Sequence, residues 1–322
     1  MNKNIIKITK ESGIPLIGVI PFGLIDRGSS LIQIRPNTQC NLKCQFCSTS
    51  ANDPDTHPFN YEVEWSYLLD WVKQVVEFKN IDIEANLDSC GEITLYKDLI
   101  KLVKGLKNIK QIKKISMQTN SLLLNESFIK ELEKAGLDRI NLSIHSLNQE
   151  TASKLACTPY NLNHILKIID LIKNSKINLC LTPVYIPGYE QDMIDLIKFA
   201  KQNSIEIAIQ KYETYKYSRR LKVKEQTFYN FYKKLTAWEK EFDIKLKYGP
   251  RDFNIIRTKK LPLVFKKGDK IQAKIVLPGW YKNQMIAYCK NRLITIINCN
   301  KNINDTVKAE ILDAKNELYI AK

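Results

Sequence analysis

The stretch CNLKCQFC, residues 40–47, places Cys40, Cys44 and Cys47 within eight residues, with two different gaps between them. A structural zinc site normally has four Cys or His ligands, and none of the three histidines stands at finger-like spacing from this stretch. Three thiolates can instead hold an iron–sulfur cluster and leave one iron without a protein ligand. We therefore expect this stretch to bind iron and to offer one iron to another ligand.

The composition fits a cytoplasmic protein with one large domain and a small one in 322 residues. No uninterrupted apolar stretch approaches the roughly 18 residues that a membrane span needs, and residues 1–10, MNKNIIKITK, lack the apolar centre of a signal peptide. In a reducing compartment, clustered cysteines indicate metal ligands or reactive thiols. The scattered cysteines are first interpreted as small buried apolar residues: Cys90, Cys157, Cys180, Cys289 and Cys299.

The charge is unevenly distributed along the chain. Residues 1–210 carry a net charge of +1, whereas residues 211–322 carry +15 of the total of +16. A general preference for lysine would have spread the charge evenly. The distribution therefore predicts a C-terminal surface for a polyanion, with a merely solubilising face as the alternative.

Apolar strand-like runs alternate with helix-period segments over the first two thirds of the chain. Six runs are predicted as strands: residues 31–36, 81–88, 114–120, 139–146, 177–186 and 205–213. The segments between them are predicted as helices, among them residues 125–136 with Asn125 as N-cap and Gly136 at the end. This alternation predicts a parallel sheet with helical crossovers, whose ligands gather at the carboxyl ends of the strands.

The pattern changes near residue 211. Residues 211–224 are basic and tyrosine-rich, residues 227–242 have a helical period, and a period of about two begins at Lys267. Short strand-like runs at residues 268–280, 284–297, 305–314 and 317–322 predict a small closed β-barrel. The predicted division is therefore an N-terminal extension (1–30), a core (31–215), a basic linker with a helix (216–260) and the barrel (261–322).

This order of motifs resembles the radical S-adenosylmethionine (SAM) superfamily, whose CxxxCxxC loop corresponds to Cys40, Cys44 and Cys47. The resemblance implies an α/β fold with a partial (β/α)6 barrel of the TIM type. It also implies two cofactors, a [4Fe–4S] cluster on the three thiolates and SAM chelated to the open iron. Reduction of the SAM sulfonium by one electron, from a donor such as ferredoxin or flavodoxin, then yields a 5′-deoxyadenosyl radical.

The same resemblance assigns residues to SAM. DSCGE, residues 88–92, corresponds to the family's GGE segment, with Cys90 in place of a common glycine. The implied SAM contacts are Phe46, Gly91, Glu92, Gln118, Asn120, Ser143, Val184 and Ile186. The alternative for polar residues at strand ends is that they cap loops. Candidates for a catalytic role are His145 as a proton shuttle, with a structural histidine as the alternative, and Cys90 or Cys157 as a carrier thiol.

The C-terminal barrel, Leu261–Lys322, resembles a TRAM domain, an RNA-binding module, through its strand rhythm. The predicted RNA contacts are Lys282, Lys290 and Arg292 in the barrel, and Lys216, Arg219 and Arg220 in the linker. Trp280 and Tyr288 are expected either to stack on bases or, more simply, to belong to the barrel core.

Together these features predict a radical SAM enzyme that methylates or otherwise functionalises a C–H bond of an RNA nucleotide, with tRNA as the leading substrate. The first alternative is a radical enzyme that modifies a protein or peptide side chain. The second is an RNA-binding protein whose iron–sulfur cluster is not catalytic. The nucleotide, the reaction that follows radical formation and the oligomeric state do not follow from the sequence.

Overall fold

The computed structural model describes residues 4–322, so residues 1–3 of the predicted N-terminal extension lie outside the described residues. The described chain divides into two compact units. The first unit comprises the described residues through Asn41, together with Asn52–Ile115 and Ile255–Lys322. The second comprises Leu42–Ala51 and Ser116–Asn254. The four segments predicted from the sequence follow chain order, whereas the compact units combine distant segments.

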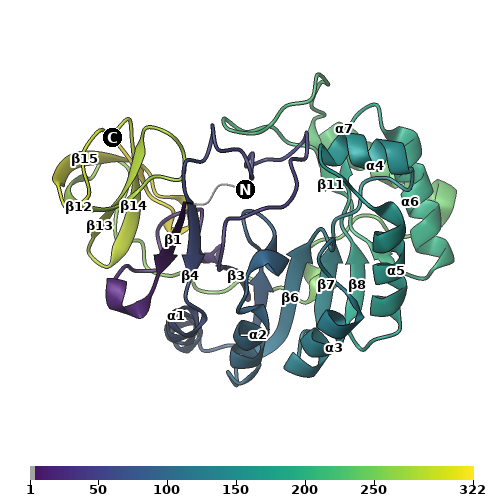
Figure 1. Cartoon of the computed structure of the whole chain (residues 1–322), viewed down its shortest axis with the longest axis horizontal. Helices are drawn as coiled ribbons and strands as arrows, with labels where there is room; N and C mark the ends of the chain where they lie inside the picture. Colours follow the sequence, from purple (N-terminus) through teal and green to yellow (C-terminus); the bar gives the residue numbers. More distant parts are fainter. Residues whose placement is uncertain (1–3) are drawn as a thin grey trace. The chain divides into compact units, whose positions relative to one another are not determined.

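The predicted alternation of strands and helices is confirmed in the chain order of the elements (Figure 1). The six parallel strands are β3 (Leu31–Arg35), β5 (Ile83–Leu87), β6 (Ile112–Thr119), β7 (Arg139–Leu142), β8 (Asn178–Leu181) and β10 (Glu206–Ile207). The helices that follow the first five are α1 (Trp65–Lys79), α2 (Leu99–Lys107), α3 (Glu126–Ala135), α4 (Gln149–Ala156) with α5 (Leu162–Lys173), and α6 (Glu190–Gln202).

In the first unit, β3 lies between two neighbours. It pairs in parallel with β5 and in an antiparallel direction with β2 (Gly23–Asp26), while β1 (Ile5–Ile8) pairs in parallel with β4 (Asn60–Val63). Helix α1 buries the apolar stripe that its period predicts, namely Leu68, Leu69, Val72, Val75 and Val76. The predicted N-terminal extension contributes two short strands, β1 and β2, to this unit.

In the second unit, β7 pairs in parallel with the carboxyl-terminal half of β6 and with β8, and β8 pairs with β10. The short strands β9 (Val184–Tyr185) and β11 (Gln210–Lys211) form a separate parallel pair. The Asn125 side chain accepts a hydrogen bond from the Phe128 N–H, and Gly136 ends α3 at φ 97°, so both predicted caps are confirmed. Helix α7 (Phe228–Phe242) is the helix of the predicted basic linker.

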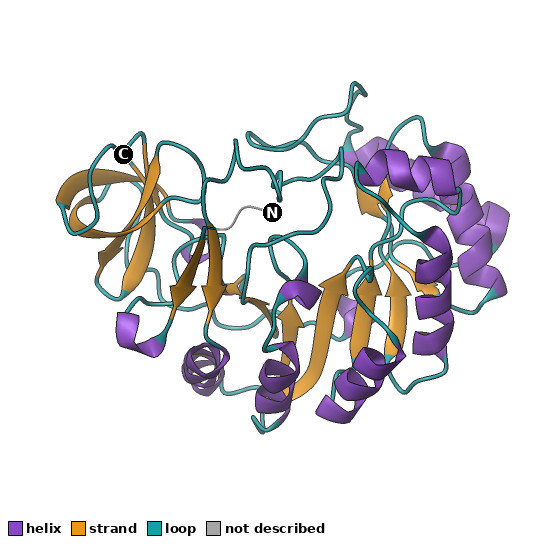
Figure 2. Ribbon diagram, in the orientation of Figure 1, coloured by secondary structure: helices purple, strands orange, loops and turns teal. Residues whose placement is uncertain are grey.

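The C-terminal strands, which lie beside the end of the chain marked C in Figure 2, close into a barrel. Their order around the barrel is β12-β13-β14-β16-β15. Their bounds are β12 (Lys270–Pro278), β13 (Gln284–Cys289), β14 (Arg292–Ile297), β15 (Thr306–Asp313) and β16 (Ile320–Ala321). The run at residues 284–297 is therefore two strands. Its turn, Lys290 and Asn291, has positive φ at both positions, which is the backbone conformation of a two-residue hairpin turn.

Hydrogen bonds tie this barrel to the N-terminal segment of the same unit. The Leu293 N–H donates to the Ile17 carbonyl at 2.9 Å, and the Tyr319 N–H donates to the Gly18 carbonyl at 2.9 Å. A Cβ atom at Gly18 would lie 2.0 Å from the Leu293 carbonyl oxygen, and the φ of Gly18 is +128°. Only glycine allows this approach of two backbones.

Candidate active site

The cysteine stretch follows β3 directly, as predicted. Cys40 belongs to the first unit, whereas Cys44 and Cys47 belong to the second, and all three residues are partly exposed. Within residues 4–322 none of the three forms a disulfide, and no set of three or more Cys, His, Asp or Glu side chains is gathered as a metal site. The assignment of these thiols to a cluster therefore remains a prediction from the sequence.

The part of the loop in the second unit is held by the end of α4. The Lys43 N–H donates to the Ala156 carbonyl at 3.1 Å, and the Gln45 N–H donates to the Leu155 carbonyl at 2.9 Å. Phe46 is buried against Leu155, and Cys44 packs against the same apolar cluster. The loop thus presents its backbone to a helix end, while its aromatic side chain anchors it in a core.

The Cys44 thiol lies in a desolvated environment. Burial raises its pKa to about 12, and the neighbouring Cys47 contributes to the rise. A thiol with this pKa stays protonated near neutral pH, so formation of an iron–thiolate bond here releases a proton.

Phe46 also contacts His145, whose ring lies 4.5 Å away in an edge-to-face arrangement. The Val184 N–H donates to Nδ1 of His145 at 3.1 Å, so the proton of the neutral imidazole is on Nε2. Burial lowers the pKa of His145 to about 4, which keeps the ring neutral at pH 7. These contacts favour the structural interpretation of His145, because the ring positions the start of β9.

The structure brings together three polar side chains at the carboxyl ends of neighbouring strands in the second unit. Nε2 of Gln118 donates to Ser143 Oγ at 2.8 Å and to Thr182 Oγ1 at 2.7 Å. Gln118 lies near the end of β6, Ser143 follows β7 and Thr182 follows β8, so the predicted Gln118 and Ser143 are joined by Thr182, which the sequence reasoning missed. The predicted fifth strand ran on to residue 186 and so enclosed Thr182, whereas β8 ends at Leu181 and leaves Thr182 at the carboxyl end of the strand. Asn120 Oδ1 instead accepts a hydrogen bond from the Leu122 N–H within its own turn.

In the first unit, the segment with Gly91 and Glu92 packs against the chain just before Cys40. A Cβ atom at Gly91 would lie 1.9 Å from the Gln39 carbonyl oxygen, so a glycine is required there. The Glu92 N–H donates to that same carbonyl at 2.6 Å. Its buried carboxylate accepts hydrogen bonds from Thr94 N–H at 3.0 Å and Thr94 Oγ1 at 2.7 Å.

The two candidate carrier thiols lie in different surroundings. Sγ of Cys90 lies 3.3 Å from Nη1 of Arg35, and the Arg35 guanidinium is also paired with Asp88 at 3.1 Å. Cys157 is exposed and ends α4 with a φ of 49°. Cys90 is therefore part of a polar group in the first unit, and Cys157 is a helix-terminal residue of the second.

Several predicted RNA contacts already have protein partners. Arg292 forms an ion pair with Glu317 at 2.8 Å, with both side chains largely buried. Lys282 lies 3.5 Å from Asp55 in an exposed pair, and Lys290 lies over the Phe265 ring. Trp280 is buried, with 3% of its surface exposed, but its ring stacks on that of His57 at 4.1 Å and lies outside the cluster of residues that fills the barrel. Tyr288 is 38% exposed, so the barrel-core interpretation is wrong for Tyr288.

In the linker, the three predicted cations differ. Lys216 and Arg220 are exposed, while Arg219 is partly buried and donates hydrogen bonds to backbone carbonyls of the cysteine loop.

A basic groove on the barrel was not predicted. It is lined by Lys270, Ile271, Gln272, Lys308, Ala309, Glu310 and Lys322. The antiparallel pairing of β12 with β15 places Lys270 opposite Glu310 and Gln272 opposite Lys308, and the Lys322 N–H donates to the Glu310 carbonyl at 3.1 Å. The alternation along each strand indicated that these lysines face outward, but their proximity depends on strand pairing.

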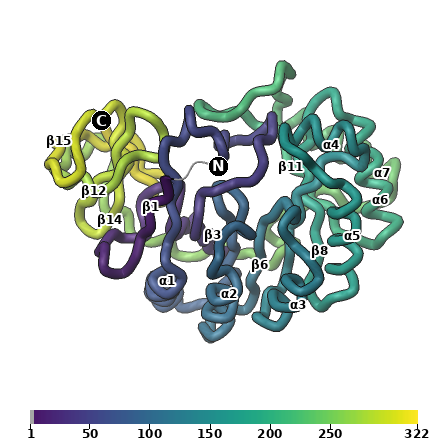
Figure 3. The backbone as a smooth tube through the Cα atoms, viewed as in Figure 1, coloured from purple at the N-terminus to yellow at the C-terminus, as the bar shows by residue number. Residues whose placement is uncertain are grey.

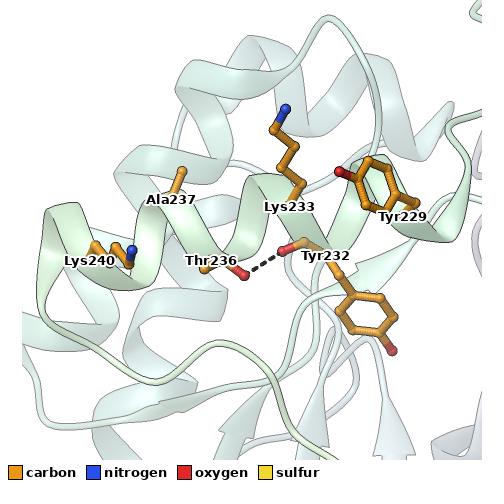
Figure 4. Close-up of a pocket in the computed structure, with 6 residues that line it drawn as sticks. All are labelled: Tyr229, Tyr232, Lys233, Thr236, Ala237 and Lys240. Atoms are coloured by element: carbon orange, nitrogen blue, oxygen red, sulfur yellow. Dashed lines mark hydrogen bonds between the residues drawn. The ribbon is translucent and has the colours of Figure 1, made fainter.

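A second shallow pocket lies along α7. It is lined by Tyr229, Tyr232, Lys233, Thr236, Ala237 and Lys240 (Figure 4). The Tyr229 and Tyr232 side chains are 73% and 47% exposed, respectively, whereas Phe231, Leu235 and Trp238 bury the opposite face of the helix. The exposed face therefore combines aromatic rings with ammonium groups.

Comparison with known proteins identifies the core. Residues 34–200 match the family model of the radical SAM superfamily. An uncharacterized protein of Methanocaldococcus jannaschii is 38% identical over 98% of this chain and 82% of its own length. The GTP 3′,8-cyclase of Aquifex aeolicus is 28% identical over 58% of this chain and 58% of its own length.

Solved structures agree on the fold. SuiB of Streptococcus suis, in a crystal structure with bound SAM, matches with a TM-score of 0.55 and 20% identity over 74% of this chain and 52% of SuiB. Methylornithine synthase matches with a TM-score of 0.50 and 13% identity over 64% of this chain and 60% of its own. This chain thus spans little more than half the length of the cyclase and of SuiB.

The chain belongs to the radical SAM superfamily and has its fold, with a small closed β-barrel at the C-terminus. The cofactors are those of the family, a [4Fe–4S] cluster and SAM. The type of donor suits this cluster, because thiolates are its usual ligands and Cys40, Cys44 and Cys47 lie outside disulfides in one loop after β3. When bound, the cluster supplies the electron that cleaves SAM. None of the helices within residues 4–322 is both long and apolar enough to span a membrane.

Proposed function

We propose that this radical SAM enzyme modifies a nucleotide of RNA, with tRNA as the substrate. The observation that carries the proposal is the concentration of positive charge in residues 211–322, which hold +15 of the net charge of +16. A binding surface for phosphates accounts for this concentration better than general solubility does, since residues 1–210 need a charge of only +1.

The barrel supports this proposal through its exposed lysines. Lys270, Lys308 and Lys322 line one groove, and their flexible ammonium groups suit phosphate oxygens spaced along a backbone. Glu310 in the same groove lowers the attraction for anions but accepts hydrogen bonds from ribose hydroxyls. The strand rhythm that resembles a TRAM domain points in the same direction.

The exposed face of α7 supports it independently. Tyr229 and Tyr232 offer rings on which unpaired bases stack, and Lys233 and Lys240 offer charges for the adjoining phosphates. A surface that only increased solubility would not require exposed tyrosine rings, because these rings are largely apolar. A nucleotide displaced from an RNA loop is therefore the substrate form that this surface suits.

For the chemistry, we propose that Cys40, Cys44 and Cys47 hold the cluster. We further assign SAM to the residues named from the family pattern, with Gln118 and Ser143 acting together with Thr182 as one polar group. The proposed outcome at the base is methylation or another C–H functionalisation. The electron comes from a small redox protein, and the enzyme works in the cytoplasm.

The cyclase relatives favour a second candidate, a free guanine nucleotide as substrate. The GTP 3′,8-cyclase of Aquifex aeolicus matches over 58% of this chain. A free nucleoside triphosphate needs only a few cationic side chains to bind its phosphates. The broad distribution of lysines over residues 211–322 therefore favours RNA over this alternative.

The two candidates separate in one experiment. The protein is reconstituted with iron and sulfide without oxygen, reduced, and incubated with SAM and either tRNA from a strain that lacks the gene or GTP. Formation of 5′-deoxyadenosine is measured in each, and the nucleosides of the digested tRNA are compared by mass spectrometry. We expect tRNA to stimulate SAM cleavage and to acquire one new modification.

A Cys44→Ala variant serves as the control, because the loss of one thiolate removes the cluster. Stimulation by GTP alone, with a new product of GTP, would replace the proposal with the second candidate. If neither tRNA nor GTP changed the rate of SAM cleavage, both candidate substrates would be excluded.

A further inference from the structure

The basic segment between β11 and α7, residues 212–225, is here called the strap. Figure 3 shows that it leaves β11 as an excursion of the backbone before the chain enters α7. Its two ends are joined, because Lys211 Nζ lies 2.6 Å from Glu225 Oε1. Oε2 of Glu225 also accepts hydrogen bonds from Thr214 N–H at 3.1 Å and Thr214 Oγ1 at 2.9 Å. The strap is therefore a loop whose two ends are held together by an ion pair and hydrogen bonds.

The tip of the strap is hydrogen-bonded to the cysteine loop of the same unit. The Arg219 N–H donates to the Cys47 carbonyl at 3.0 Å, and Nη2 of Arg219 donates to the Ala51 carbonyl at 2.8 Å. The same guanidinium reaches the carbonyl of Cys44 at 3.4 Å through Nη1. Ser218 Oγ donates to the Ser48 carbonyl at 3.1 Å. One arginine thus contacts the backbone at both cysteines of this part of the loop.

Apolar contacts extend the attachment. Leu221 and Val223 of the strap pack against the cluster of buried residues that contains Phe46, with Cys44 on the same cluster. The Leu221 N–H donates to the Tyr212 hydroxyl at 3.1 Å, which folds the strap back on its own base.

The loop itself offers few internal bonds. Residues 42–51 contain no helix or strand, and their internal backbone hydrogen bonds are turn contacts such as Cys47 N–H to Cys44 O at 3.1 Å and Ser50 N–H to Cys47 O at 3.4 Å. A loop of this kind keeps one conformation only where other segments hold its carbonyl groups.

We propose that Arg219 is a positioning residue that holds residues 42–51 of the cysteine loop in one conformation, on which assembly of the cluster depends, with the strap as its support. The forked guanidinium suits this task, because it donates to several carbonyls at fixed angles while its charge offsets that of the thiolates. This inference goes beyond the proposed function, since it does not depend on which substrate is modified. It also reassigns Arg219, which the sequence reasoning gave to RNA.

Hydrogen–deuterium exchange on the full-length protein without a cluster tests the inference directly. We expect Arg219→Ala to raise the exchange rate of the amides in residues 42–51 at least tenfold. Arg219→Lys should give a smaller rise, because lysine keeps the positive charge but loses the forked set of donors. Arg220→Ala is the matched control. It removes the neighbouring exposed arginine, whose Nη2 donates to the Tyr215 carbonyl at 3.2 Å within the strap, and should leave the loop amides unchanged.

A second readout uses the reconstituted protein without any substrate. Release of iron to a chelator is expected to be at least tenfold faster in Arg219→Ala than in Arg220→Ala. If Arg219→Ala does not fold, Arg219→Lys and Ser218→Ala decide by the same two measurements. Unchanged loop exchange and iron release in these variants, with a loss of RNA affinity equal to that of Arg220→Ala, would overturn the inference and return Arg219 to the RNA contacts.

Discussion

Lys79 and Asp26 form an ion pair of 2.9 Å in which both side chains are almost completely withdrawn from water. Nζ of Lys79 also donates to the Lys259 carbonyl at 3.0 Å, and Oδ2 of Asp26 accepts a hydrogen bond from the Leu261 N–H at 3.0 Å. The pair therefore connects α1 and β2 to the chain that enters the C-terminal barrel. Each charge has its partner and further hydrogen bonds, which is the condition for a tolerated buried pair.

Replacement of one member of this pair is expected to be strongly destabilising. Lys79→Met leaves the Asp26 carboxylate buried without its counter-charge, and a loss of about 3–5 kcal/mol in the free energy of unfolding is typical of such a change. The double variant Lys79→Met, Asp26→Leu should recover part of this loss, because no charge is left buried. Urea unfolding of the parent protein, Lys79→Met, Asp26→Leu and the double variant measures the coupling. Equal losses in the single and double variants would contradict the expected role of the charge.

Gly91 provides a second prediction through its close approach to Gln39. Gly91→Ala places a methyl group 1.9 Å from a backbone oxygen, which the chain relieves only by moving the segment next to Cys40. We expect a loss of about 1–3 kcal/mol or more in stability, together with weaker cluster assembly measured by bound iron.

Gly105→Ala is the matched control for this change. Its added methyl group would lie 2.1 Å from a terminal carbon of the flexible Leu69 side chain, and alanine favours the helix by about 1 kcal/mol. The control should therefore stay within about 1 kcal/mol of the parent protein and assemble the cluster normally. If both variants lost the same stability and bound the same amount of iron, the contact between Gly91 and the Gln39 backbone would not account for the loss.

The lowered pKa of His145 predicts that the stability of the protein depends on pH. Its pKa is about 4 in the folded chain, below the ordinary value of 6.5, so the unfolded chain binds the extra proton between these values. Stability is therefore full above pH 6.5 and falls as the pH decreases toward 4, by up to about 3 kcal/mol from this group. His145→Gln should flatten this window in urea unfolding of the cluster-free protein. A variant that keeps the same slope would assign the dependence to other groups.

The local features of this fold could be predicted from the sequence because they depend on neighbouring residues. The six strands follow from apolar runs, and the Asn125 cap follows from a side chain that reaches the Phe128 N–H three residues later. The turn at Lys290 and Asn291 was missed, because it lacks the glycine that usually marks two positions with positive φ. The pairing of β1 with β4 joins segments too distant for any local signal.

The candidate site shows the same limit. The cysteine spacing and the polar strand ends are local, and they indicated the cluster loop and the residues Gln118 and Ser143. Arg219 was placed with the RNA contacts because its neighbours are basic, whereas its partners Cys47 and Ala51 lie far away in the sequence. Lys270, Lys308 and Lys322 likewise meet only through strand pairing.

The barrel groove predicts how RNA binding responds to salt. Replacement of Lys270, Lys308 and Lys322 by Gln removes three charges from one groove. We expect the slope of log K against log salt for tRNA binding to become less steep by about 2–3, since each phosphate contact contributes about one. The control replaces three exposed lysines of the first unit outside the barrel, Lys73, Lys104 and Lys110, by Gln. An equal change in both triple variants would indicate only an effect of net charge.

The exposed face of α7 predicts a contribution to RNA binding that salt does not remove. Tyr229→Ala and Tyr232→Ala each delete a ring that is 73% or 47% exposed, and we expect each change to weaken binding of an unpaired RNA segment by about 1–3 kcal/mol. The salt slope should stay unchanged, because no charge is lost. Tyr229→Phe and Tyr232→Phe keep the rings and should bind like the parent protein. Weaker binding in the phenylalanine variants would assign the contact to the hydroxyl groups and exclude stacking as its main cause.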